Sequence, residues 1–133
     1  MIRGLGLVAL PRLPGLRLKH ELAARGIKTA TPRALAALSA AERARSVVVV
    51  QDAFTSHFEP GLVLDLLDLL TALGFRPWLA PFRPNGKPLH VHGFLGRFER
   101  VAARNAGMLR ALAAEGVPLV GLDPSMTLVY RSE

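Results

Sequence analysis

Three polar, turn-rich segments of this chain carry the side chains that could bind or transform a ligand. The first follows Gln51 and brings two hydroxyl groups. The second, RPNGKPLHVHG, places an amide, an ammonium and two imidazoles between hydrophobic stretches. The third begins near Asp123. The residues in these segments with ligand-binding potential are Thr55, Ser56, Asn85, Gly86, Lys87, His90, His92 and Ser125.

The turn from Asn85 to Lys87 has the chemistry of an anion site. Backbone N–H groups of a glycine-containing loop, a helix N-terminus and one ammonium group can converge there on a carboxylate or a phosphate. The alternative is a plain turn, in which Gly86 and Pro88 set the backbone and the Lys87 ammonium group lies in solvent. The residues alone leave both interpretations open.

Metal binding and acid–base catalysis are weaker possibilities. His90 and His92 are two residues apart, so on an extended segment they would share a face and could bind a metal as neutral imidazoles. Their spacing matches no metal-binding signature, however. Asp52 and Asp123 could act as an acid–base pair, although carboxylates at strand ends more often cap the following helix. We therefore assign no metal site and no catalytic residue to this chain.

Strands and helices alternate in the segment that must position these groups. The run SVVVVQDAF, which has no polar interruption until Gln51, predicts a strand buried on both faces, and RPWLAPF and VPLVGLD predict two more. A helix is expected around Pro60, with Ser56 and Glu59 at capping-box spacing, and it should end at Gly74. A long helix from about His92 to Gly116 and a last helix from Pro124 complete the pattern. In the long helix, Phe94, Phe98, Val101, Met108 and Leu112 form one apolar stripe that we expect in the core.

This β-α-β-α-β-α order predicts a three-layer α/β fold with a parallel sheet of at least three strands and right-handed crossovers. Because parallel strands end at the same edge of their sheet, the three polar segments should meet there. Residues 1–45 are predicted to form a helical lead-in, with Pro32 at one helix start and a capping box from Ser39 to Glu42. Residues 46–133 form the α/β domain, and together the two parts are expected to make a single compact domain, a fragment of a larger protein.

Composition narrows the classes of partner. The chain has 133 residues, of which 50% are hydrophobic, so it fits one domain with a real core. Its net charge is +7, but the basic residues are scattered singly and without interleaved aromatics, which argues against nucleic-acid binding. No apolar run approaches the length of a membrane span. The absence of cysteine excludes disulfides, thiolate catalysis and cysteine-bound metals.

DAFTSHFEP, PNGKP and AARNAGMLRALAAEGVPLVGLDPSM, in this order, resemble the cysteine-rich CCG domain of iron–sulfur oxidoreductases. In that family a strand ends Asp-Cys-Phe-Thr, a Cys-Cys-Gly loop follows the next strand, and Glu-Pro-Ser-Cys follows a third. The resemblance covers about residues 46–133. An iron–sulfur cluster requires thiolates, so none is expected here. The positions that match the four family cysteines are Ala53, Pro84, Asn85 and Met126.

A closer resemblance spans nearly the whole chain. QDAFTSHFEP, PFRPNGKPLHVHGFLGRF and LVGLDPSMTLVYR are similar to the C-terminal domain of large bacterial FAD- and iron–sulfur-containing dehydrogenases of the D-lactate and D-2-hydroxyglutarate type. The resemblance implies an accessory, interdomain module with no cofactor of its own, partnered by the other domains of its parent. FAD and iron–sulfur clusters are expected in that parent. A cytoplasmic location is implied, where electron-transfer partners could hold the parent at the inner membrane. The alternative is a small anion- or carboxylate-binding α/β domain.

Overall fold

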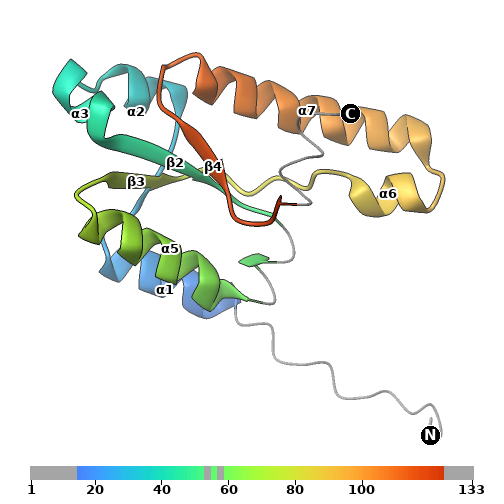
Figure 1. Cartoon of the computed structure of the whole chain (residues 1–133). Helices are drawn as coiled ribbons and strands as arrows, with labels where there is room; N and C mark the ends of the chain where they lie inside the picture. Colours follow the sequence, from blue (N-terminus) through green and yellow to red (C-terminus); the bar gives the residue numbers. More distant parts are fainter. Residues whose placement is uncertain (1–14, 53–54, 57–58, 125–133) are drawn as a thin grey trace, which may run out of the picture.

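A four-stranded parallel sheet lies at the centre of the described part of this molecule (Figure 1). The structure is a computed structural model and describes residues 15–52, 55–56 and 59–124. It confirms the predicted α/β fold with a layer of helices on each side of the sheet. The strands, in their order across the sheet, are β1 (Lys28–Thr29), β3 (Arg76–Leu79), β2 (Ser46–Val50) and β4 (Leu119–Gly121).

Helices cover both faces of this sheet. On one face, α1 (Gly15–Ala24) packs beside α5 (Pro60–Ala72), and on the other α2 (Pro32–Ala36) contacts α7 (Leu95–Ala113). The short helix α3 (Ala40–Arg45) leads directly into β2, and α6 (Lys87–Val91) precedes α7. Within the described residues, no helix combines the length and the apolar character needed to cross a lipid bilayer.

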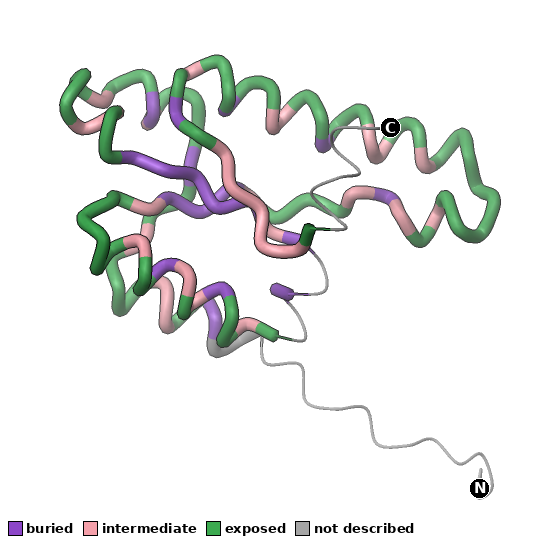
Figure 2. Tube along the Cα trace, in the orientation of Figure 1, coloured by how far each residue is buried: buried purple, intermediate pink, exposed green. Residues whose placement is uncertain are grey.

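The central strand β2 contributes side chains to both hydrophobic core clusters of the described residues. All five of its residues are buried, as Figure 2 shows. Because successive strand side chains point to opposite faces, neighbouring valines serve different cores. Val48 belongs to the cluster with Trp78 and Leu112, under α7. Val49 belongs to the cluster with Val63 and Leu67, under α5. Full burial of one such side chain stabilises the fold by about 1.5–3 kcal/mol.

One of the two predicted capping boxes is present. At the start of α3, the Ser39 hydroxyl accepts from the Glu42 N–H at 3.2 Å, and the Glu42 carboxylate accepts from the Ser39 N–H at 3.0 Å. The predicted box from Ser56 to Glu59 is wrong. Glu59 is the N-cap of α5 but makes no side-chain cap bond. The Ser56 hydroxyl is buried and donates to Gln51 Oε1 at 3.2 Å instead, so it is not available to α5.

The lead-in segment is more than a set of helices, because it contributes an edge strand. Lys28 and Thr29 of β1 pair with Trp78 and Leu79 of β3. The sequence did not reveal this strand, since two polar residues are too short a stretch to show periodicity. Leu22 and Leu35 pack into the two core clusters from the same segment. The division between residues 45 and 46 stays a prediction.

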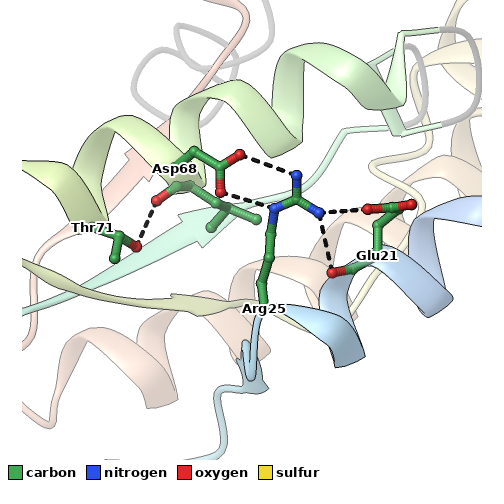
Figure 3. Close-up of polar contacts among 5 residues, drawn as sticks. Glu21, Arg25, Asp68 and Thr71 are labelled. Atoms are coloured by element: carbon green, nitrogen blue, oxygen red, sulfur yellow. Dashed lines mark hydrogen bonds and ion pairs between the residues drawn. The ribbon is translucent and has the colours of Figure 1, made fainter.

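Arg25, just after α1, ties that helix to α5 (Figure 3). Its Nε donates to Asp68 Oδ1 at 2.8 Å and its Nη2 to Asp68 Oδ2 at 3.1 Å. A third bond runs from Nη1 to Glu21 Oε2 at 2.6 Å. The hydrogen bonds from Arg25 hold the pKa of Asp68 below its ordinary value, and the same carboxylates raise the pKa of Arg25. The fork joins segments that are 43 residues apart.

The predicted long helix corresponds to α7, and the loop expected before it contains the short helix α6. Between them, Gly93 turns the chain with φ of +77°, and α7 begins at Leu95 rather than near His92. Leu112 is buried and Met108 packs against the core, as predicted. The expectation of a core position is wrong for Phe94, which is 55% exposed. The reason is tertiary, because α6 and the start of α7 project beyond the sheet (Figure 1).

Candidate functional site

In this sheet topology, ligand binding is favoured at the carboxyl ends of the neighbouring strands β2 and β3. The two strands are neighbours in parallel register, with Val49 opposite Leu79. The chain leaves β2 toward α5 on one face and leaves β3 toward α6 and α7 on the other. Ligands in open α/β sheets bind at such a switch point. Since β4 flanks β2 in parallel as well, the described parts of all three polar segments follow strands that end at one sheet edge, as predicted.

The segment after β2 is held by its own side chains. Asp52 Oδ1 accepts from the Thr55 N–H at 2.8 Å, and its Oδ2 accepts from the Thr55 hydroxyl at 2.5 Å. Gln51 Nε2 donates to the Ala80 carbonyl at 2.8 Å, which ties this segment to the end of β3. Asp52, Thr55 and Ser56 are all buried. The carboxylate therefore caps a turn, which was the simpler of its two interpretations.

The turn from Asn85 to Lys87 packs against α7. Asn85 Oδ1 accepts from the Lys87 N–H at 3.0 Å, which closes the turn on itself. Gly86 is the N-cap of α6 with φ of +83°, and a Cβ at this position would lie 2.9 Å from Phe98 Cδ2. Its carbonyl accepts from the N–H groups of Leu89 and His90 at 2.9 and 3.1 Å. Anion binding by Asn85 and Lys87 stays a prediction.

His90 and His92 do not lie on an extended segment. His90 belongs to α6 and its ring lies 4.9 Å from the ring of Phe98, whereas His92 is the exposed C-cap of α6. Residues two apart on a helix are separated by about 200° around its axis, so the expectation of a shared face is wrong. Gly86 is the N-cap of α6 and Pro88 lies in its first turn, so this segment is helical rather than extended. In the described portion of the chain, no three His, Asp or Glu residues are grouped to hold a metal.

The positions that correspond to cluster ligands do not offer cluster chemistry. Pro84 has no side-chain donor atom and is exposed, and the Asn85 amide oxygen is engaged by the Lys87 N–H. With no cysteine anywhere in the sequence, thiolate ligation of iron is impossible. Ala53, Ser125 and Met126 lie outside the described residues, as does all of the predicted last helix after Pro124.

A groove that sequence analysis missed lies between α2 and α7, beside the same sheet edge. Its volume is about 450 Å³, and Arg83 and Arg104 line it. Among the described residues, neither guanidinium group has a hydrogen-bond or ion-pair partner. The helical spacing of Arg97, Arg100 and Arg104 places these three residues on one face of the long helix, and this pattern includes only one of the two arginines of the groove. The apolar lining comes from Ala30, Pro32, Pro81, Met108, Ala111 and Leu112.

Proteins named D-2-hydroxyglutarate dehydrogenase match almost the whole chain. The Pseudomonas putida protein is 52% identical over 128 residues, the Pantoea ananatis protein 46% over 129 residues, and the Escherichia coli protein 42% over 129 residues. These alignments cover 96–97% of this chain. The chain spans only 13% of the length of each of these relatives. No protein-family model and no solved structure matches it.

Proposed function

We propose that this chain is an accessory, interdomain module of a D-2-hydroxyglutarate dehydrogenase. The observation that carries the proposal is the extent of the sequence matches. Nearly all of this chain aligns with a segment that makes up 13% of the length of each dehydrogenase of that name. The parent oxidises the D-2-hydroxy acid with FAD and passes electrons to iron–sulfur clusters, in the cytoplasm. The module holds neither cofactor, and its partners are the parent's other domains.

The polar side chains near the switch point support a structural role. Asp52, Thr55 and Ser56 are buried and bonded within their own segment, and Gln51 uses its amide to join two strand ends. A catalytic acid or base must reach a proton on the substrate. These side chains are already hydrogen-bonded within the protein, and their bonds hold the ends of β2 and β3 together.

An exposed apolar surface supports docking. Val91 is 69% exposed, Phe94 55% and Leu95 60%, and the three follow one another closely where α6 turns into α7. We call these three residues the α6–α7 tip. Figure 2 shows that this part of the chain is largely exposed and extends beyond the buried sheet. Clustered apolar side chains on a projecting element mark an interaction surface, because burying them against a partner is favourable.

The test is a chimera of the Pseudomonas putida dehydrogenase in which this chain replaces the matching segment. We expect D-2-hydroxyglutarate oxidation close to that of the unaltered enzyme, and a large loss when the segment is deleted. Within the chimera, Phe94→Ser with Leu95→Ser should reproduce most of the loss, because the tip would no longer dock. Turnover is measured with an artificial electron acceptor, alongside reduction of the flavin in a single turnover.

The matched control is Leu69→Ser with Leu73→Ser at the C-terminal end of α5, where the side chains are 55% and 64% exposed. These changes remove similar apolar area from a helix on the other face of the sheet, and turnover should remain. Equal loss in the two variants would contradict docking through the tip. A deletion variant as active as the complete enzyme would contradict the proposed function.

A further inference from the structure

We propose that the groove between α2 and α7 binds a small organic carboxylate through Arg83 and Arg104. The inference concerns ligand binding by this chain itself and goes beyond the docking role. It places the ligand on the face of the sheet that α7 covers, in a groove whose lining does not include Asn85, Lys87 or His90.

The fold builds the groove from three distant segments. Ala30 follows β1 and lies in the core, Pro32 begins α2, and Pro81 follows β3. Met108 and Leu112 of α7 close the apolar wall. A volume of about 450 Å³ falls in the range of roughly 300–1,000 Å³ that is usual for small-molecule sites. The wall is part of one of the two core clusters, so it is held rigidly.

The charges of the groove select an anion. Several other arginines of the described residues are engaged: Arg25 and Arg76 pair with carboxylates, and Arg45 donates to the Gly74 carbonyl at 3.2 and 3.1 Å. Arg83 and Arg104 line the groove without such a partner among the residues that the structure describes. A guanidinium group binds a carboxylate with two parallel hydrogen bonds, which is a strong and directional contact.

The apolar wall selects the body of the ligand. Inorganic phosphate would leave Met108 and Ala111 facing water, whereas an aliphatic chain of a few carbons would cover them. The small side chain of Ala111, which is exposed, leaves room for such a chain. Two guanidinium groups beside one wall suit a short dicarboxylate, with one carboxylate for each arginine.

Titration calorimetry on the 133-residue chain tests this with glutarate as the probe. We expect a dissociation constant of roughly 1 mM at low salt, as suits a ligand with few heavy atoms. Affinity should fall as salt rises, since the contacts are charged and partly exposed. Glutaramide, which has the same length and no charge, should not bind. Phosphate should bind more weakly than glutarate, because it cannot cover the wall.

Three variants locate the ligand. Arg83→Gln and Arg104→Gln should each weaken glutarate binding by about tenfold or more, as expected for loss of a charged hydrogen-bonded contact. Ala111→Leu fills the groove from the exposed side of α7 and should block binding without disturbing the core. Arg100→Gln is the matched control, because Arg100 is exposed on the same helix and does not line the groove. It should bind glutarate like the unaltered chain.

Absence of binding by the unaltered chain would overturn the proposal, and so would equal affinities in the Arg100 and Arg104 variants. If glutarate does not bind but Arg104→Gln impairs the chimera, the groove takes an acidic segment of the parent and the carboxylate assignment is wrong. Because the titration uses the isolated chain, its failure leaves the docking test untouched.

Discussion

Glu42 illustrates how one side chain can serve two segments. Its Oε2 accepts from the Ser39 N–H at the start of α3, and its Oε1 accepts from Arg76 Nη1 of β3 at 2.8 Å. The bond from the Ser39 backbone, followed by the bond from Arg76, lowers the pKa of Glu42 from 4.5 to about 2. The contact with Ser39 was predicted from the sequence as a capping box. The contact with Arg76 depends on β3 lying beside β2, which the sequence alone did not show.

This shift predicts an acid-dependent loss of stability. Because the pKa of Glu42 is lower in the folded chain, its stabilisation is complete above about pH 4.5 and is lost as the pH falls toward 2. The free energy of unfolding, measured by urea denaturation across this window, should therefore fall with pH. Glu42→Gln should flatten the slope, and Arg76→Gln should flatten it less, since the Ser39 N–H remains. An unchanged slope in Glu42→Gln would contradict the assignment.

At the scale of elements, the turn into α6 shows what a sequence pattern leaves out. A turn set by Gly86 was one of the two interpretations of this segment, and Gly86 has a φ of +83°. The structure adds that α6 folds back on α7, so that Gly86 faces Phe98 and Val101. Gly93, with φ of +77°, has the same backbone requirement and no atom within 4 Å of an added Cβ.

These two glycines form a matched pair for substitution. Gly93→Ala should cost about 1–2 kcal/mol of stability, which is the strain of a side chain in the left-handed region. Gly86→Ala should cost about 1–3 kcal/mol more, because the new Cβ would also overlap the Phe98 ring. The free energies of unfolding of both variants, from urea denaturation, give the comparison. Equal losses would mean that α6 does not pack on α7 as described.

For the whole molecule, the lead-in segment is part of the architecture rather than an appendage. Its strand β1 covers the edge of β3, and Leu22, Ile27 and Leu35 add to the two core clusters. Trp78 lies between β1 and β2, is 8% exposed, and donates from its indole nitrogen to Ser46 Oγ at 3.4 Å. Because Trp78 is the only tryptophan in the sequence, its fluorescence reports on the packing of β3 between β1 and β2.

Residues 46–133 alone should therefore not form the native sheet. Without β1, β3 becomes an edge strand and Trp78 loses part of its cover, so its fluorescence should shift to longer wavelength. Urea unfolding of the fragment should lose cooperativity, since both cores lack packing partners. A peptide of residues 15–45, added in excess, should restore part of the native emission. A fragment that unfolds as cooperatively as the full chain would instead support the predicted boundary at residues 45 and 46.

The sequence by itself determined the fold class, the presence of β2 and α5, the capping box at Ser39 and the sheet edge where the polar segments meet. Each of these depends on short-range periodicity or on the fixed direction of parallel strands. Only the tertiary structure decided that β1 exists, that Phe94 is exposed and that Arg83 and Arg104 share a groove. Such features depend on contacts between residues far apart in the chain, and a local pattern carries no record of those contacts.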